Sequence, residues 1–541
     1  MKRKLLIIFM ALLMITVLTA CNDENGEEEG ENGQVQEEEA GDPTYGGSLR
    51  FAVPEVTHGN VLYQNPDELH HLHQLIFESL VTFDEDFSII PQIAEDWSIS
   101  EDGQVVEFVI PSDLTWHDGA PFTVEDIDFT VQAIKNAPEE NISEHIYQNS
   151  IRHISYVREL ENGNVEISFT RPFSSALEAL TFPILPSHLF EDNSDLLESD
   201  DFPWVGTGAY RLENRNQESI TLTKFEDHNR KDPYIETIEV RIIEDYDEGM
   251  TMFEEGELDL FHSRYVDVTG NENVEEAQIH AFASMHFEFL AFNFQQNSPV
   301  SENSQIRRVL EEAVNREQVI EEAYFGYATA TDTPIHPEHW LHHGDLSQEE
   351  PIGDDELEQL MLEEGYERND DGLWVDESGN TLELQILVNE NHTPRVIAAE
   401  IIREQLNQNG FDVSLDQDSF DNIQGRLEEG DFDLYFGAWE LGMLPDLSFV
   451  FHSDFTLRTN FMHYENEEMD GLIEEAFRAP SQEAKQEQYQ ALQNAVRDDL
   501  PLISLYFLQD TYLVSEGVYG DISPRAHNIF ANIEDWYMET E

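Results

Sequence analysis

Negative charge dominates this chain and limits how it can become compact. It carries 114 Asp and Glu side chains against 27 Lys and Arg, a formal net charge of −87 over 541 residues. Such self-repulsion opposes folding in dilute buffer, whereas at about 1 M salt the screening length falls to about 3 Å. We interpret the surface as adapted to high salt, with high external pH as the alternative cause. Nucleic acid and anionic lipid headgroups are poor partners for such a surface, so we expect no nucleic-acid partner.

The N-terminus has the pattern of an export signal. Basic residues 2 to 4 precede a run from Leu5 to Leu18 in which only Thr16 is not apolar. This run is too short to span a bilayer core of about 30 Å comfortably as a helix. The residues that follow, "LTAC", resemble the lipobox of bacterial lipoproteins, in which the signal is cut before the cysteine and the cysteine receives lipid.

Cys21 is the only cysteine, so it makes no disulfide within the chain. We expect residues 1–20 to be a lipoprotein signal peptide and Cys21 to be the lipid attachment site. An ordinary secretory signal with an incidental cysteine is the alternative. Residues 21–45 are then an acidic disordered tether, because too few apolar side chains are present to offset the entropy cost of ordering.

These segments predict where the protein works. We expect it at the cell membrane on the extracellular face, or on the periplasmic face if the cell has an outer membrane. No later segment approaches 18 consecutive apolar residues, so the lipid anchor is the only expected contact with the membrane.

The body of the chain mixes hairpins with alternating helices and strands. "WSISEDGQVVEFVI" and "VRELENGNVEISF" each place a Gly-containing turn between β-rich runs and predict hairpins. Thr123 and Asp126 have capping-box spacing and predict the start of a helix. "SQIRRVLEEAVNREQVIEEAYFG" predicts one helix that ends at Gly326. Residues 395–439 have the pattern of a helix, a strand, a second helix and a second strand. This alternation favours an α/β lobe with ligand contacts at the carboxyl ends of its strands.

The common catalytic signatures are missing. The sequence has no G-x-x-x-x-G-K-[ST] phosphate loop, no G-x-S-x-G elbow and no H-E-x-x-H. With so many acids, neighbouring carboxylates carry no catalytic information. We therefore expect no enzyme and no cofactor.

Two groups of histidines are the remaining candidates for metal ligands. They are His70, His71 and His73 in "LHHLH", and His336, His339, His342 and His343 in "IHPEHWLHHGD". Imidazoles at such spacing can ligate nickel or zinc. However, Pro337 predicts a loop for the second group, and the first lies beside an amphipathic helix. We expect no metal site, although the sequence leaves the second group open.

Several blocks of the chain carry a family resemblance. They are residues 76–131, "GTGAYRL" at 206–212, "FLAFNFQQNSPVSENSQIRRVLEEAVNREQVI", "LEEGY" and "DDLPLISLYF". In this order they are similar to blocks of the family 5 extracellular solute-binding proteins, the oligopeptide- and dipeptide-binding group of ABC importers. Ala209 stands where that family usually has proline. The resemblance covers nearly everything from about residue 46 to the end.

The resemblance implies an α/β fold that is two-lobed and periplasmic-binding-protein-like, of class II and the peptide-binding type, with an inserted subdomain in lobe I. Lobe I is expected at residues 46–285, including the hairpin-rich inserted subdomain at about 77–185. Lobe II is expected at 286–505, and residues 506–541 return to lobe I. Such a protein is expected to capture an oligopeptide as a monomer and to deliver it to the permease subunits of an ABC importer.

The segment "GAWELGMLPDLSFVFHS", residues 437–453, corresponds by resemblance to part of the ligand cleft. The ligand-binding residues implied in this way are Gly437, Ala438, Trp439, Glu440, Gly442, Asp446 and Asn293. A core position is the alternative for Trp439.

In one subgroup of the family, an aspartate at the position of Gly442 anchors the α-ammonium of the peptide. The segment is more similar to a WSLGxDPD pattern, with Leu444 replacing the first aspartate and Asp446 retained. Unless Glu440, Asp446 or another acid reaches the same place, the amino end of the ligand lacks a carboxylate partner, and the protein should tolerate a blocked end.

Other functions stay open at this point. A peptide-sensing surface lipoprotein without a transport role would share the same features. A surface peptidase would need a nucleophile or metal triad that the motifs do not supply. Within the solute-binding class, nickel, sugars and dipeptides are alternative ligands.

Replacement of Cys21 by serine should abolish membrane anchoring. The sulfur of Cys21 is the only expected lipid attachment point, so the Cys21→Ser variant should lack lipid and normal processing. Mass spectrometry of the N-terminus and membrane fractionation measure this. A variant that is processed and lipid-modified like the parent would contradict the lipobox interpretation.

Stability should rise with salt. Screening removes the repulsion among the carboxylates that opposes the compact state. Thermal melts in roughly 0.05 M and about 2 M NaCl should give a higher melting temperature in the second buffer. Equal melting temperatures would rule out this interpretation of the charge.

Overall fold

The computed structural model describes residues 43–539 except for short gaps at 55–58, 138–145, 191–193, 200, 264–273, 275–276, 297, 345, 347–351, 444 and 455–459. The predictions for the signal peptide, for Cys21 and for most of the tether therefore lie outside the described residues. No helix in the described part of the chain is long and apolar enough to cross a membrane.

The first sheet brings together strands that are far apart in sequence. Its order is β1 (Ser48–Pro54), β10 (Thr237–Ile243), β9 (Ser219–Lys224) and β8 (Tyr210–Arg215). β1 and β10 are parallel, and the other neighbours are antiparallel. α2 (Asp67–Gln74) packs against β1, and α5 (Tyr246–Glu254) packs against β10 and against β11 (Leu260–Ser263).

The predicted hairpins form a second four-stranded sheet. β4 (Asp96–Ile99) pairs with β5 (Val105–Val109), and β6 (Ile154–Glu159) pairs with β7 (Val165–Phe169). All its neighbours are antiparallel, so both hairpin predictions are confirmed.

Short elements complete this region. α3 (Val124–Lys135) begins with the predicted capping box between Thr123 and Asp126, which is confirmed. The others are β2 (Val81–Phe83), β3 (Ile89–Pro91), α4 (Gln148–Ile151) and three 3-10 turns at Glu178–Leu180, Ser187–Leu189 and Ser194–Glu198.

A seven-stranded mixed sheet joins the two halves of the body. Its order is β11, β19 (Leu502–Val514), β12 (Gln278–Phe292), β18 (Leu434–Glu440), β16 (Glu383–Asn389) and β17 (Asp412–Asp418), with β13 (Ala328–Ala330) also paired to β19. β16 is parallel to β17 and β18, whereas β12 is antiparallel to β18 and β19.

Helices of this second half follow the predicted alternation. α11 (Thr393–Gln408), β17, α12 (Phe420–Glu429) and β18 confirm the helix–strand–helix–strand pattern. The remaining elements are α7 (Pro299–Glu302), α10 (Asp354–Glu363), β14 (Glu367–Arg368), β15 (Trp374–Val375), α13 (Ser448–Phe451), α14 (Glu467–Phe477) and α15 (Gln482–Asp499).

The prediction of one helix up to Gly326 is wrong. The stretch forms α8 (Ser304–Glu312) and α9 (Arg316–Tyr324), separated by a short break. The side chain of Asn315 accepts a hydrogen bond from the backbone N–H of Gln318 at 3.0 Å. Asn315 is therefore the N-cap of a second helix, a role for which asparagine is strongly preferred.

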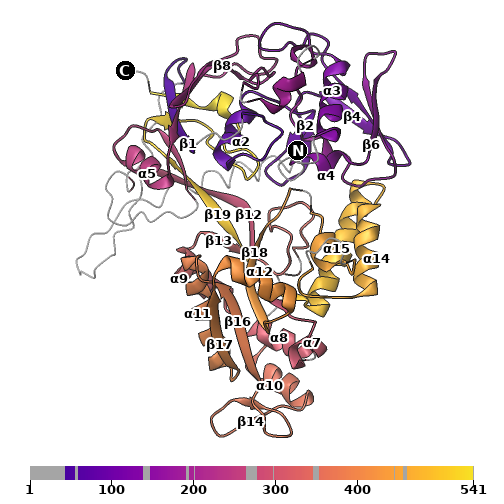
Figure 1. The fold of residues 1–541 in the computed structure, drawn as a ribbon, viewed down its shortest axis with the longest axis vertical. Helices are drawn as coiled ribbons and strands as arrows, with labels where there is room; N and C mark the ends of the chain where they lie inside the picture. Colours follow the sequence, from indigo (N-terminus) through magenta and orange to yellow (C-terminus); the bar gives the residue numbers. More distant parts are fainter. Residues whose placement is uncertain are drawn as a thin grey trace, which may run out of the picture. The chain divides into compact units, whose positions relative to one another are not determined.

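Separate hydrophobic cores divide the body into two lobes. The first core contains apolar residues of β1, α2, the hairpin sheet and the C-terminal segment, and we call the region around it lobe I. The cores around β16 and around α14 and α15 belong to what we call lobe II. β12 and β19 contribute residues to the cores of both lobes and run from one lobe into the other (Figure 1). The cores therefore do not test the predicted lobe boundaries at residues 285 and 505, which stay predictions.

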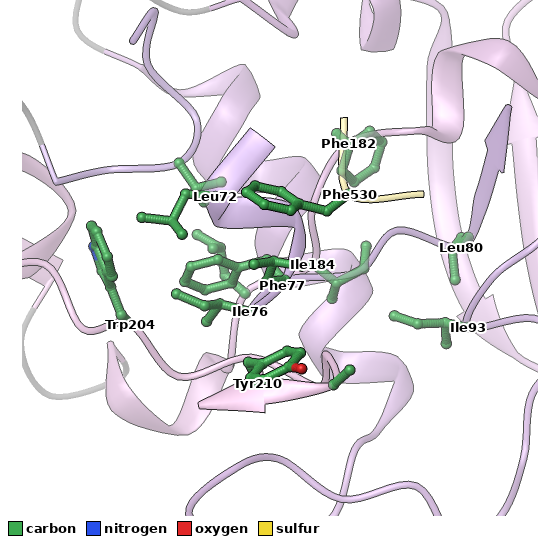
Figure 2. Packing of buried hydrophobic residues seen from close by; sticks show 14 of the residues in the cluster. Leu72, Ile76, Phe77, Leu80, Ile93, Phe182, Ile184, Trp204, Tyr210 and Phe530 are labelled. Atoms are coloured by element: carbon green, nitrogen blue, oxygen red, sulfur yellow. The ribbon is translucent and has the colours of Figure 1, made fainter. Parts of the chain in front are cut away.

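The core of lobe I joins the beginning and the end of the chain. Figure 2 shows Leu72, Ile76 and Phe77 packed near Phe530, which comes from the C-terminal segment. The ring of Phe530 also meets the ring of Phe51 edge-on, with centroids 5.3 Å apart. The short strands β20 (Val518–Tyr519) and β21 (Tyr537–Met538) pair with each other in the same C-terminal segment.

The two glycines of "GTGAYRL" allow close packing on the residues that follow α2. A Cβ atom at Gly206 would lie 1.8 Å from the carbonyl oxygen of Ile76, and one at Gly208 would lie 2.4 Å from that of Leu75. The N–H of Gly208 donates to Ile76 O at 2.9 Å. Any larger residue would push this segment, which leads into β8, away from the core of lobe I.

Candidate ligand cavity

A cavity of about 410 Å³ lies between the lobes. Lobe I contributes side chains from α2, from β2 and from the segment around Glu178. The long strands contribute Ser284, Met285 and Asp510, and residues 440–443, at the end of β18 and directly after it, also line the cavity. The size falls in the range of about 300–1,000 Å³ that is usual for small-molecule sites.

A bulge in β12 forms part of the wall. Pairing with β19 shifts between Ala283 and Phe287, so that Ser284, Met285 and His286 together face Leu508. The hydroxyl of Ser284 donates to the carbonyl of Leu508 at 2.7 Å and accepts from the N–H of His286 at 3.2 Å. Bulges bend a strand and re-aim its side chains, which here turns Ser284 and Met285 toward the cavity.

Glu440 occupies the carboxyl end of β18, directly opposite His286 on β12. Its carboxylate is 3.3 Å from Nδ1 of His286, and its side chain is 61% exposed. Glu440 and Gly442 both line the cavity.

A buried ionic network supports this edge from within lobe II. Glu288 is fully buried, and its Oε1 accepts from Nε and Nη2 of Arg395 at 3.0 and 2.7 Å. The hydroxyls of Tyr324 and Tyr506 donate to its Oε2 at 2.7 and 3.1 Å. Burial opposes ionisation of Glu288, but the charge of Arg395, the hydrogen bond and charge of His286 and the hydrogen bond from Tyr324 lower its pKa to about 2. Glu288 also lies 3.5 Å from Nε2 of His286, so it links Glu440 to the core of lobe II.

The cavity contains one histidine that carries charge. Nδ1 of His262 is 3.0 Å from Glu68, and its Nε2 is 3.5 Å from Asp510. Burial opposes protonation of His262, but the hydrogen bonds and charges of Asp510 and Glu68 outweigh it and raise the pKa to about 9. His262 is therefore an imidazolium at neutral pH.

The other cavity histidines are neutral. Burial lowers the pKa of His70 and His527 to about 4 and that of His73 to about 3. Neither ring nitrogen of His73 has a hydrogen-bond partner among the described residues. The wall therefore offers neutral imidazoles beside one buried cation. The sequence singled out "LHHLH" only as a candidate metal site, and nothing in it marked His262, Asp510 or His527.

Several predicted site residues lie away from this cavity. Trp439 belongs to an aromatic cluster of lobe II, and its ring stacks on Phe289 with centroids 3.8 Å apart. Gly437 lies within β18, where a Cβ atom would be 2.4 Å from the ring of Tyr435 and 3.0 Å from that of Phe289. Ala438, between them in β18, is not among the residues that line the cavity.

Asn293 and Asp446 also lie elsewhere. The amide of Asn293 is buried and donates to the carbonyls of Gly430 and Phe432 at 2.8 and 2.7 Å. Asp446 accepts from the N–H of Ser448 at 2.9 Å and lines two smaller cavities, of about 100 and 30 Å³. Leu444 lies outside the described residues.

The second histidine group lies where the lobes meet. Nδ1 of His336 accepts from the N–H of Glu338, and Nδ1 of His339 accepts from the N–H of Leu341, each at 3.1 Å. The ring of His339 stacks on Phe87 of lobe I, with centroids 5.3 Å apart. Within the described residues, no group of three or more His, Cys, Asp or Glu side chains is placed to hold a metal ion.

Acid should destabilise the protein well above the pH at which its carboxylates titrate. Burial lowers the pKa of His336 to about 4 and those of His73 and His339 to about 3. Below pH 6.5, the unfolded chain binds protons that these buried rings do not. The free energy of unfolding should therefore fall from about pH 6.5 toward 4, by up to about 1.4 kcal/mol per pH unit for each histidine.

His262 should have the opposite effect. Because its folded pKa is raised to about 9, its stabilising contribution is full below pH 6.5 and is lost as the pH rises toward 9. Denaturant melts between pH 4.5 and 9 at fixed salt measure the free energy of unfolding on the acidic and on the alkaline side. His262→Gln should remove most of the decrease in this free energy on the alkaline side. A free energy of unfolding that stays constant between pH 6.5 and 4.5 would contradict the first expectation.

Comparisons with known proteins agree with this architecture. Residues 88–460 match the middle region of the bacterial extracellular solute-binding proteins, family 5. The chain is 22% identical to the oligopeptide-binding protein AppA of Bacillus subtilis (strain 168), over 99% of both chains. The structure of that AppA with a nonapeptide matches with a TM-score of 0.64 at 20% identity, covering 92% of this chain and 100% of the other.

A structure with a different ligand matches as well. NikZ from Campylobacter jejuni, solved in complex with Ni(L-His), has a TM-score of 0.66 at 24% identity, covering 91% of this chain and 99% of the other. These likenesses support the two-lobed α/β fold. The family match extends over more than half of the chain, and the protein therefore belongs to the family 5 bacterial extracellular solute-binding proteins.

Proposed function

We propose that the protein captures oligopeptides outside the cell and delivers them to the permease subunits of an ABC importer. The observation that carries this proposal is the 410 Å³ cavity, which lies between two lobes and is lined by both. A site of this kind can enclose a ligand when the lobes close and release it when they open. The similarity to an oligopeptide-binding protein along nearly the whole chain supports a peptide as the ligand.

The location of the protein and its membrane anchor are part of the same proposal. We infer that Cys21 carries lipid, that residues 21–45 are a tether, and that the body acts as a monomer at the outer face of the membrane. The lobe boundaries at residues 285 and 505 belong to this proposal too. The family consists of solute-binding proteins, and we propose no enzymatic activity for this member.

Nickel bound by histidine or another small chelator is the second candidate ligand. Imidazoles of His70, His71, His73, His262 and His527 all line the cavity. NikZ, which is similar in fold, was solved with Ni(L-His). Against this candidate, the described side chains do not gather around one point where a metal could be held. We therefore place peptides first.

We further propose that Glu440 pairs with the α-ammonium of the peptide. The sequence alone predicts tolerance of a blocked amino end only if no acid takes the place of the missing aspartate at Gly442. Glu440 lines the cavity two residues before Gly442, whereas Asp446 faces the two smaller cavities. A buried ammonium without a partner is costly, so this carboxylate should contribute to affinity.

Calorimetry with peptides tests the function. The mature protein, in about 2 M NaCl to screen its surface charge, is titrated with a nonapeptide library and then with the tightest-binding member. We expect saturable binding of intact peptide. Binding of Ni(L-His) without any peptide binding would favour the second candidate, and cleaved peptide would indicate a peptidase.

Acetylation of that peptide tests the anchor. N-acetylation should weaken binding at least about tenfold, or 1.4 kcal/mol, because the ammonium is lost. In Glu440→Gln, free and acetylated peptides should bind alike, whereas the control Asp446→Asn should keep the full difference. An acetylation effect that survives in Glu440→Gln would assign the anchor to another acid.

A further inference from the structure

The segment around Ser174 in lobe I caps the C-terminal end of α14 in lobe II. The N–H of Ser174 donates to the carbonyl of Phe477 at 3.1 Å, and its hydroxyl donates to that of Ala476 at 2.8 Å. These carbonyls belong to the last turn of α14, where the helix itself has no N–H groups left to donate to them. The guanidinium of Arg171 lies 4.5 Å from the centre of the Phe477 ring. Lobe I therefore supplies hydrogen bonds that α14 alone lacks.

An ion pair crosses between the lobes next to this contact. The ammonium of Lys485, on α15, donates to the carboxylate of Glu178 and to the hydroxyl of Ser175, the latter at 3.1 Å. The side chains of Lys485 and Glu178 are only 2% and 9% exposed. We call the contacts of Ser174, Ser175 and Glu178 with Ala476, Phe477 and Lys485 the clasp.

Lys485 is unusual in this chain. Only four lysines follow residue 21, and Asp and Glu outnumber Lys and Arg by 87 in the whole chain. Lys231, by comparison, pairs with Asp535 with both side chains about half exposed. Lys485 is buried between the lobes, so it contributes little to balancing the charge of the surface. We therefore look for its role in the contact between the lobes.

Glu178 connects the clasp to the ligand cavity, because the same residue lines the 410 Å³ cavity. A second contact between the lobes lies next to Lys485. Its ammonium is 5.7 Å from the centre of the Trp340 ring, and the N–H of Trp340 donates to the carbonyl of Asp86 in lobe I at 2.9 Å. The neighbouring Phe87, which stacks on His339, has a positive φ of 62°. Such a backbone is uncommon for a bulky residue and needs support from its surroundings.

We propose that Lys485 is a positioning residue for ligand capture, whose ion pair with Glu178 holds the lobes together over the cavity. This rests on the proposed function of the cavity. The observed affinity of a closing protein is its intrinsic affinity reduced by the fraction of molecules in the closed state. Loss of the clasp should lower that fraction and weaken every ligand that needs both lobes, although Lys485 itself does not line the cavity.

Lys485→Met tests the proposal in the full mature chain. Binding of the tightest nonapeptide should weaken at least about tenfold, measured by calorimetry. Lys485→Arg keeps the charge and should recover most of the affinity. Lys231→Met removes an ion pair within lobe I and should leave affinity unchanged. The melting temperature of the peptide-free protein should stay within a few degrees of the parent, which separates loss of closure from loss of folding.

A double-mutant cycle assigns the effect to the pair. Glu178→Gln changes the cavity wall as well as the clasp, so its single effect is not diagnostic. If the pair acts as proposed, Lys485→Met should weaken binding much less in the Glu178→Gln background than in the parent. Equal effects in both backgrounds would overturn the assignment to this pair.

Spin labels report closure without relying on a ligand. Cysteines introduced at the exposed positions Tyr156 in lobe I and Leu362 in lobe II, in a Cys21→Ser chain, give one distance across the clasp. Lys485→Met should shift its distribution, with or without peptide. Identical distributions in both chains, or unchanged peptide affinity, would overturn the proposal. A parent that binds no peptide while Lys485→Met still shifts the distribution would contradict the proposed function alone.

Discussion

The ladder between β12 and β19 is the constraint on which the rest of the structure depends. The two strands pair from Gln278 and Val514 at one end to Ala291 and Leu502 at the other, and they contribute to the cores of both lobes. Their pairing is interrupted only around Ser284 and Glu288. The first interruption coincides with the wall of the cavity. The same irregularity thus shapes the site and gives the ladder a place where fewer regular hydrogen bonds resist bending.

Local patterns in the sequence predicted local structure well. The two hairpins, the capping box of α3 and the alternation from α11 to β18 depend on residues within about one element of each other, and all are present. The helix break at Asn315 was missed because the apolar period continues on both sides of it. α8 and α9 are separate helices because the side chain of Asn315 caps the N-terminus of α9 instead of continuing one helix.

The site was harder to predict because distant segments build it. The end of β18 was expected to reach the ligand, and Glu440 and Gly442 do line the cavity. Trp439 is one residue earlier on the same strand, and because strand side chains alternate between faces it packs into the aromatic cluster instead. His262, Asp510 and His527 come together only through the β11–β19 pairing and the return of the C-terminal segment, which no local pattern records.

The positions of the basic side chains connect the net charge of the chain with the proposed closure of the lobes. Most carboxylates in the described part of the chain are at least partly exposed, and salt screens them there. Several buried basic groups are held in pairs instead, among them Arg395 with Glu288, His262 with Glu68, and Lys485 with Glu178. Screening by mobile ions acts far less on buried pairs than on exposed ones. A change in external salt should therefore alter the repulsion across the surface while leaving these pairs largely intact. Burial thus gives a strongly acidic protein a way to keep the contact between its lobes when the salt concentration around it changes.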